Sequence, residues 1–491
     1  MTAAARLRIG IWSPLPPSPS GVADYVVESL EALLAHADVF LVAEDAGRVD
    51  PAVGRRVAVH SAAQAPAADL DVYHLGNSPD HAFVYRRALR EPGVAVLHEW
   101  SLHHLVLHET VERGDLASYL REMRRAHGER GTFVARQVAR ALGGALLPAL
   151  FPLSDRVLER SLAVVALTAA VTARVARRLP ARPRLHLRHH LALPLDPLPS
   201  RAEARRALGL PPDALLVTAP GLATATKGLR PAMRALGRLR REHPALHLVI
   251  AGDRDPRLPL AEWAEEAGLG GAWTLTGRLG LPDFVRHLCA ADLVLGLRFP
   301  SHGEMSGALV RALGVGRPVL VTAGTPAADE FPEGVVVPVA PGPHEEDELF
   351  AMLGHLLASP ALRETIGGLA RAHVREHHGL EAVTRDLVGF LEDVHHRKAA
   401  LAAAVAAEEG DSDASLLAYF TEEVRAGARD LGLLALPLGL DAILGSLGGA
   451  TQQRPEAASG AEFTSAQRAG GPGGAAAGRA MARHKQHPQD K

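Results

Sequence analysis

The chain contains 491 residues, which is too long for a single hydrophobic core and predicts two or three domains. Apolar residues make up 47% and charged residues 22% of the sequence, the balance of a soluble globular enzyme. The formal net charge of −2 and the aromatic content of 4% argue against a dedicated nucleic-acid binder and against a base-stacking surface. The single cysteine, Cys289, lies in an apolar run and is expected to be buried, and a disulfide within the chain is excluded.

The first half of the chain alternates short β-branched apolar runs with longer amphipathic stretches. This pattern is typical of a parallel sheet wrapped by helices. Helices are predicted over 21–34 and 102–125, and 129–160 is predicted to be a helical insertion. The predicted strands are 7–12, 39–43, 72–75, 94–97 and 163–167.

A Pro-rich stretch at 191–200 predicts a linker, because three prolines in six positions cannot continue a helix or a central strand. A second alternating set follows it. Its predicted strands are 215–219, 246–251, 273–276, 293–297, 319–322 and 335–339. Its predicted helices are 228–242, 260–268, 281–290, 306–315 and 347–357. The expected α/β fold is therefore two Rossmann-like domains that face each other across a ligand-binding cleft.

The predicted division of the chain has five parts. These are a first domain at 1–195, a second domain at 196–379, an amphipathic helix at 380–397, a helical extension at 398–447 and a disordered tail at 448–491. No secretory signal opens the sequence, and its most apolar late stretch is too interrupted to span a membrane. A cytoplasmic location is therefore expected.

Lys227 is the only lysine in the first 397 residues. Lysine and arginine together number 53 and only four are lysines, which leaves 53 − 4 = 49 arginines. Lys227 lies in a turn between Gly221 and Gly228 that joins a predicted strand to a predicted helix. A compact ammonium beside the free amides of a helix start suits a phosphate, although the order of residues is not that of a P-loop. A phosphate site is predicted here, and the alternative is a surface lysine.

Two positions in the first domain are candidates for ligand contact. Gly21 opens a predicted helix after a Pro/Ser-rich loop, so its free amides suit an anionic ligand, unless the loop is only a stiff connection. His98 directly follows the predicted strand 94–97, at the edge of the sheet that faces the cleft. His103 and His104, on the following helix, are weaker candidates.

The segment from Arg298 to Ala308 joins a predicted strand to the next helix. Ser306 is the predicted N-cap, and Gly307 leaves the backbone open for close approach. Glu304 is predicted to accept hydrogen bonds from sugar hydroxyls, and the alternative is a loop carboxylate stabilised by the helix dipole.

At these residues the chain resembles the GT-B glycosyltransferases, and within them the retaining, nucleotide-sugar-dependent family 4 group, over roughly residues 7 to 397. The resemblance rests on the Gly21 loop, on His98 and on the turn around Lys227. It rests also on four short matches in the family's order, at 251–253, 276–279, 291–293 and 316–319.

The resemblance implies transfer of a sugar from a nucleotide-diphosphate sugar with retention of anomeric configuration, and no metal or resident cofactor. The donor would lie on the second domain and the acceptor on the first, and the helix at 380–397 would cross back to the first domain. Lys227, His98 and Glu304 would be catalytic, with Lys227 at the leaving phosphate, His98 orienting the sugar and Glu304 holding its hydroxyls. The implied donor-binding residues are Gly21, Gly221, Gly228, Arg298, Ser306, Gly307, Ala308 and Arg311. The acceptor is a glycan, a lipid-linked sugar or a small molecule, no nucleic acid or membrane-spanning segment is expected, and peripheral membrane contact stays open.

The sequence departs from the family pattern at two places. Leu222 stands where the family often has arginine. The family's two glutamates, eight residues apart, should fall at positions that here carry Gly303 and Arg311, with Glu304 one position from the first. Arg311 either offsets the missing phosphate arginine or is a solvated helix residue. A catalytically inactive GT-B-like binding or scaffold protein is therefore the alternative. A phosphorylase or an epimerase of the same fold is a third alternative. A phosphorylase is less favoured because the scarcity of lysine leaves no obvious second candidate to carry pyridoxal phosphate.

Overall fold

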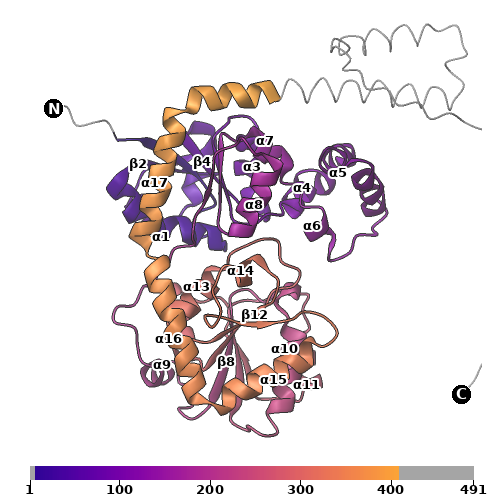
Figure 1. Cartoon of the computed structure of the whole chain (residues 1–491), viewed down its shortest axis with the longest axis vertical. Coiled ribbons are helices and arrows are strands. Elements are labelled where there is room, and N and C mark those ends of the chain that lie inside the picture. Colours follow the sequence, from indigo (N-terminus) through magenta and orange to yellow (C-terminus); the bar gives the residue numbers. More distant parts are fainter. Residues whose placement is uncertain (1–5, 409–491) are drawn as a thin grey trace, which may run out of the picture. The chain divides into compact units, whose positions relative to one another are not determined.

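The computed structural model describes residues 6–408, all within one compact unit, and contains two parallel α/β domains (Figure 1). The first sheet has seven strands in the order β3-β2-β1-β4-β5-β6-β7, and the second has six in the order β10-β9-β8-β11-β12-β13. Every strand pairing in both sheets is parallel. The predicted fold class is confirmed.

The strands of the first domain are β1 Arg8–Trp12, β2 Asp38–Ala43, β3 Val59–Ser61, β4 Leu70–Leu75, β5 Val94–Leu97, β6 Ala163–Ala166 and β7 Arg184–His186. Its α-helices are α1 Gly21–His36, α2 Pro51–Gly54, α3 Ala82–Ala88, α4 His103–Glu109, α5 Leu116–Val138, α6 Leu147–Leu150, α7 Asp155–Arg160 and α8 Ala169–Arg178. The three-residue edge strands β3 and β7 were not predicted, because such short runs show no periodicity.

The prediction of one helix over 102–125 was wrong. Helix α4 ends at Glu109, and α5 begins only at Leu116. Gly114 between them has a φ of +81°, a left-handed conformation that no helix continues through. Asp115 then caps α5 by accepting a hydrogen bond of 2.9 Å from the amide of Ser118, which fixes the start of the second helix.

The strands of the second domain are β8 Leu215–Pro220, β9 Leu246–Ala251, β10 Trp273–Leu275, β11 Leu293–Gly296, β12 Val319–Thr322 and β13 Val337–Val339. Its α-helices are α9 Arg201–Ala207, α10 Leu229–Leu239, α11 Leu260–Glu266, α12 Leu281–Ala290, α13 Gly307–Gly314, α14 Pro326–Asp329, α15 Glu345–Ala358 and α16 Pro360–His377. Helices α9, α14 and α16 were not predicted. Helix α17, Leu380–His396, follows and packs against α1 of the first domain (Figure 1).

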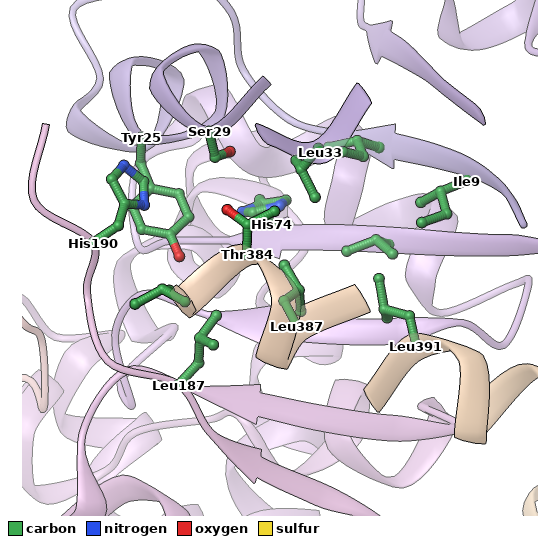
Figure 2. Close-up of a pocket in the computed structure, with 13 residues that line it drawn as sticks. Ile9, Tyr25, Ser29, Leu33, His74, Leu187, His190, Thr384, Leu387 and Leu391 are labelled. Carbon is green, nitrogen blue, oxygen red and sulfur yellow. The ribbon is translucent and has the colours of Figure 1, made fainter. Parts of the chain in front are cut away.

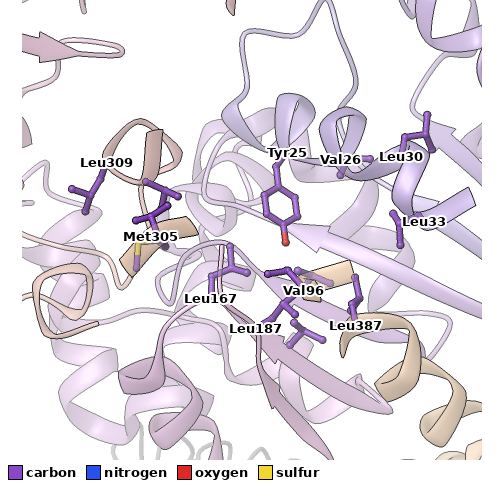
Figure 3. Close-up of a cluster of buried hydrophobic side chains, with 14 of the residues drawn as sticks. Tyr25, Val26, Leu30, Leu33, Val96, Leu167, Leu187, Met305, Leu309 and Leu387 are labelled. Atoms are coloured by element: carbon purple, nitrogen blue, oxygen red, sulfur yellow. The ribbon is translucent and has the colours of Figure 1, made fainter. Parts of the chain in front are cut away.

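One apolar cluster runs through parts of both domains (Figure 3). Leu30 of α1 and Leu387 of α17 belong to it, together with Met305 and Leu309 beside the start of α13. Full burial of a leucine stabilises the fold by about 1.5–3 kcal/mol, so these contacts hold the start of α13 firmly.

The C-terminal predictions are only partly covered by the structure. Residues 398–408 are helical. The remainder of the predicted helical extension and the predicted disordered tail lie outside the described residues. Within residues 6–408, no helix is both long enough and apolar enough to cross a membrane.

Candidate functional site

The turn that carries Lys227 is fixed at both ends by glycines in the left-handed conformation. Gly221 has a φ of +81° and Gly228 a φ of +58°, which other residues adopt only with strain. The ammonium of Lys227 folds back and donates a hydrogen bond to the carbonyl of Pro220, at the end of β8. A Cβ atom at position 221 would lie 3.2 Å from Nζ of Lys227, so a side chain there would crowd the ammonium.

The ammonium of Lys227 is held without a compensating negative charge. No ion pair among the described residues includes it, and within this part of the chain its ammonium donates a hydrogen bond only to the Pro220 carbonyl. Burial, and then the nearby guanidinium of Arg298, lower the pKa of Lys227 from its ordinary 10.5 to about 7. An anion bound beside this lysine would favour its charged form and so offset both effects, which makes the turn suited to bind an anion.

The loop after β11 brings Arg298 and Glu304 beside the lysine turn. The amide of Phe299 donates a 2.7 Å hydrogen bond to the carbonyl of Thr226, which joins the loop to the residue before Lys227. Nε of Arg298 lies 2.9 Å from Oε1 of Glu304. The adjacency follows from the sheet, because β8 and β11 are neighbours and their carboxyl ends meet at one edge.

The carboxylate of Glu304 is nearly closed to solvent, with 7% of the residue exposed. Besides Arg298, it accepts a 2.6 Å hydrogen bond from the amide of His302 and a 3.3 Å hydrogen bond from the hydroxyl of Ser301. These donors fix the position of the carboxylate. Among the described residues only Arg298 contacts Oε1, so this oxygen can accept a further hydrogen bond from a donor such as a hydroxyl.

The same loop contacts the first domain directly. The carbonyl of His302 accepts hydrogen bonds from the amides of Trp100, at 2.7 Å, and Ser101, at 3.2 Å. Gly303 has a φ of +88°, and a Cβ there would lie only 2.7 Å from Cβ of Trp100. Only glycine allows this approach, which brings Glu304 and the residues after His98 into one region.

The start of α13 is capped as predicted. The hydroxyl of Ser306 accepts a 3.3 Å hydrogen bond from the amide of Leu309. The amides of Gly307 and Ala308 belong to the first turn, where no intrahelical acceptor exists. A Cβ on Gly307 would lie 2.9 Å from Nη1 of Arg311 and 3.1 Å from Nε2 of His189, so cationic and imidazole groups flank this helix start.

His98 is buried among aromatic and imidazole rings. Its Nε2 lies 2.9 Å from Nδ1 of His74, and its ring packs edge-on against Tyr25 with centroids 5.0 Å apart. Burial, and then the neighbouring His74, lower the pKa of His98 well below 6.5. His98 is therefore neutral at physiological pH and offers a hydrogen bond without a charge.

Arg311 joins the two domains. Its Nη2 donates to Oε1 of Glu28 on α1, and its Nε donates at 3.2 Å to the carbonyl of Ala192. His190 Nε2 lies 3.3 Å from the other oxygen of Glu28. The Arg311 side chain is only 11% exposed, so it is not a solvated helix residue, and in this structure its guanidinium is engaged by Glu28 instead of grouped with Lys227.

The start of α1 also faces the second domain. Ser20 caps α1 by accepting a 3.2 Å hydrogen bond from the amide of Val22, and a Cβ on Gly21 would meet nothing within 4 Å. Arg278 of the second domain reaches the carbonyl of Ser18 at 3.5 Å. Gly21 thus borders open space beside the other domain.

Leu222 stands at the position of the family's arginine. This leucine is 53% exposed to solvent.

Several residues around His98 were not found by sequence reasoning. Tyr25 is surrounded by His74, His98, His189 and His190, with ring centroids 4.3 to 6.0 Å from its own. Glu99 is a further one. Burial is the largest single influence and disfavours its charge, but His302, the amide of Asn77 and Arg298 together outweigh it and lower the pKa of Glu99. The only sequence signal was the pair His189-His190 just before the Pro-rich linker.

An apolar cavity near His74 and His190 is not the ligand site. It lies between α1, α17 and the first sheet and is lined mainly by side chains such as Ile9, Leu33 and Leu387 (Figure 2). Its volume is about 10 Å³, which is barely enough for one water molecule. Within the described residues, no three His, Cys, Asp or Glu side chains are grouped to hold a metal ion.

Known proteins share this fold and part of this sequence. Residues 214–359, less than a third of the chain, match the family described as Glycosyl transferases group 1. The D-inositol 3-phosphate glycosyltransferase of Saccharomonospora viridis is 30% identical over 190 residues, covering 36% of this chain and 42% of the relative. The D-inositol 3-phosphate glycosyltransferase of Actinosynnema mirum is 31% identical over 195 residues, which cover 36% of this chain and 43% of the relative. The chain thus matches about two fifths of the length of these curated relatives.

Solved structures show the same two-domain fold. HepE of Anabaena, in complex with UDP-glucose, has a TM-score of 0.56 at 15% identity. The match covers 79% of this chain and 100% of the HepE chain. Sucrose-phosphate synthase from Thermosynechococcus elongatus has a TM-score of 0.54 at 17% identity and covers 79% and 99%. At these identities the likeness concerns the fold alone, which is GT-B, and the predicted resemblance to the GT-B glycosyltransferases is confirmed.

Proposed function

We propose that this chain transfers a sugar from a nucleoside diphosphate sugar to an acceptor on the first domain. The premise is that the chain has the GT-B fold and carries the group 1 glycosyl transferase pattern in its second domain. The observation that carries the proposal is the uncompensated ammonium of Lys227 beside Arg298, at the strand end that meets the Glu304 loop. Two neighbouring cations, one of them paired with a carboxylate, suit a ligand that bears both phosphates and hydroxyls.

The reaction breaks the bond between the anomeric carbon and the diphosphate oxygen. The electron pair of that bond passes to the oxygen, where Lys227, Arg298 and the free amides at the start of α13 stabilise the developing charge. Phosphate binding raises the pKa of Lys227 again, so the lysine is an ammonium when the charge develops. Glu304 accepts hydrogen bonds from sugar hydroxyls, and neutral His98 orients the sugar from the other domain.

Retention of anomeric configuration is part of the proposal. The acceptor hydroxyl attacks the face that the diphosphate leaves, and its proton passes to the departing phosphate oxygen. Nearby carboxylates are already engaged, Glu304 by Arg298 and Glu99 by His302, which favours this front-face route over a double displacement. His98 is neutral and buried, so it suits the orientation of a neutral sugar ring.

Calorimetric titration of the full chain with UDP-, GDP- and ADP-sugars, followed by assay of nucleoside diphosphate release with candidate acceptors, tests the function. At least one donor should bind, and Lys227→Ala should lower its turnover about 100- to 1000-fold. The anomeric coupling constant of the product, measured by NMR, should match that of the donor. Absence of binding to every nucleotide sugar would overturn the proposal, and an inverted product would overturn retention.

A catalytically inactive sugar-nucleotide-binding protein is the second candidate. It is favoured by Arg311, which stands at the position of a glutamate in the family pattern and is paired with Glu28 of the other domain. The two candidates separate in the same experiment, because an inactive protein binds a donor and releases no nucleoside diphosphate with any acceptor of a panel that includes soluble glycans and lipid-linked sugars.

A further inference from the structure

Exposed apolar side chains gather on the helical insertion of the first domain, which lies beside α4 (Figure 1). Eight large hydrophobic residues are exposed in the part of the chain that the structure describes, and four of them fall between positions 133 and 150. The four are Phe133 at 64%, Leu142 at 67%, Leu146 at 49% and Leu150 at 66% exposure. The other four are scattered over the second domain, so exposed apolar side chains are concentrated on the insertion.

The same segment is cationic and contains no acid. Residues 130–154 include no Asp or Glu, and their arginines are exposed. Within residues 6–408 no ion pair involves these arginines, whereas nearby Arg125 lies 2.8 Å from a carboxylate oxygen of Glu159. The unpaired arginines are Arg130, Arg136 and Arg140.

Helix geometry puts the aromatic side chain and the cations together. In the C-terminal half of α5, Arg130 lies three residues before Phe133 and Arg136 lies three residues after it. All three side chains therefore share one face of the helix. The opposite side of this half is fixed, because Gly131 is buried and its Cβ would lie 2.0 Å from the carbonyl of Met123. The exposed face therefore cannot turn inward without separating the two halves of α5.

The segment is also anchored to the candidate site. Ser101 Oγ donates a 2.7 Å hydrogen bond to the carbonyl of Pro148, and the amide of Leu102 donates a 2.8 Å hydrogen bond to that of Pro152. His103 Nδ1 lies 2.5 Å from the carbonyl of Phe151. These three residues directly follow Glu99 and Trp100, so the patch has a fixed position relative to the acceptor side of the site.

We propose that residues 130–150 are a docking surface for a lipid bilayer with anionic headgroups. The unpaired guanidinium groups would bind headgroup phosphates, and the exposed phenylalanine and leucines would insert among the acyl chains. A bilayer satisfies both halves of the surface at once, since it offers negative charge directly above a continuous apolar layer. If the proposed sugar transfer holds, on which this extension rests, the acceptor is borne by a lipid.

Co-sedimentation of the full chain with vesicles tests the docking surface without any donor, so its outcome is independent of the proposed function. The protein should bind mixed phosphatidylglycerol and phosphatidylcholine vesicles, bind phosphatidylcholine alone much more weakly, and dissociate as salt rises. Joint replacement of Arg130, Arg136 and Arg140 by glutamine should weaken binding about fivefold per arginine, on the order of a hundredfold in total. Joint replacement of Phe133 and Leu142 by serine should weaken it at least about tenfold.

Matched controls come from exposed residues elsewhere. The triple replacement Arg206→Gln, Arg375→Gln and Arg385→Gln, and the single Leu369→Ser, should leave vesicle binding unchanged. All the altered side chains are exposed, so the circular-dichroism melting midpoint should stay that of the parent.

Three outcomes would overturn the proposal. One is a full chain that binds no anionic vesicle at low salt, and another is patch variants that bind as tightly as the controls. The third is a patch variant that turns a dimer into a monomer in size-exclusion chromatography while vesicle binding stays the same, which would assign the surface to a second copy of the chain.

Discussion

The two sheets carry their polar residues at the same place, the carboxyl ends of their central strands, but the chemistry at the two ends differs. In the second domain Lys227, Arg298 and Glu304 are charged or chargeable and lie within one pair of neighbouring turns. In the first domain His98 and His74 are neutral, and they pack on Tyr25. One architecture thus provides a cationic turn in the second domain and a cluster of neutral imidazoles in the first.

This difference indicates a division of labour between the domains. Charged groups without full compensation recognise a charged part of a ligand, whereas buried neutral imidazoles recognise hydroxyls and exclude charge. The second domain therefore suits the diphosphate and the first suits the sugar ring. Measurements on four features of the site test this division between the domains.

The largest effect is expected for Lys227→Ala. Loss of a donor to a developing oxyanion costs about 100- to 1000-fold in turnover, so kcat/KM for the donor should fall by that factor. Steady-state release of nucleoside diphosphate measures it. Lys398, whose Nζ donates to the carbonyl of Asp69, is the matched control, and Lys398→Ala should retain full activity. Unchanged turnover in Lys227→Ala would refute the charged role of the second domain.

Glu304→Gln is expected to have a smaller effect. Glutamine keeps the shape but loses the charge that pairs with Arg298, and a hydrogen bond to a charged group is worth about 1.5–3 kcal/mol. Activity should therefore fall roughly 10- to 100-fold. The exposed Glu333, replaced by glutamine, serves as control. A variant as active as the parent would remove Glu304 from the site.

Donor affinity should depend on pH through Lys227. The pKa of the free lysine is about 7, and a bound diphosphate raises it, so the protonated enzyme binds more tightly. Affinity should be constant below pH 7 and weaken about tenfold per unit above it, until the pKa of the complex is reached. Calorimetry of a nucleotide sugar, whose diphosphate keeps its charge over this range, measures the slope. Lys227→Met should bind weakly at every pH, and a slope that persisted in this variant would assign the titration elsewhere.

The smallest effect is expected for His98→Gln. A hydrogen bond between neutral groups contributes about 0.5–1.5 kcal/mol, so turnover should fall only severalfold. The affinity for a nucleoside diphosphate should not change, because His98 does not carry charge. His104→Gln is the neighbouring control. If His98→Gln weakened nucleoside diphosphate binding as much as Lys227→Ala does, the division between the domains would be wrong.

Much of the fold was predictable because the central strands are apolar and buried along their length. Strands such as β5 and β6 show this as unbroken runs, whereas β3 and β7, at the edges of the first sheet, do not. The break between α4 and α5 was missed because Gly114 and Asp115 read equally well as helix surface residues until their backbone angles are known.

The candidate site was predictable where it follows the order of strands. Lys227 and Glu304 come after neighbouring strands, so their proximity is built into the sheet. The partner of Arg311 was not predictable in the same way. Glu28 lies 283 positions away in the other domain, and its contact depends on how the domains pack, which no local pattern records. The same is true of His189 and His190 around Tyr25.

The lowered pKa of Lys227 has a practical consequence. An amine with a pKa near 7 is a nucleophile at neutral pH, whereas a lysine with an ordinary pKa is almost fully protonated there. Since the sequence has only four lysines, an acylating reagent used near neutral pH would modify few sites and Lys227 preferentially among the side chains. The chain thus contains its own point of attachment for covalent probes, one that a bound donor would shield.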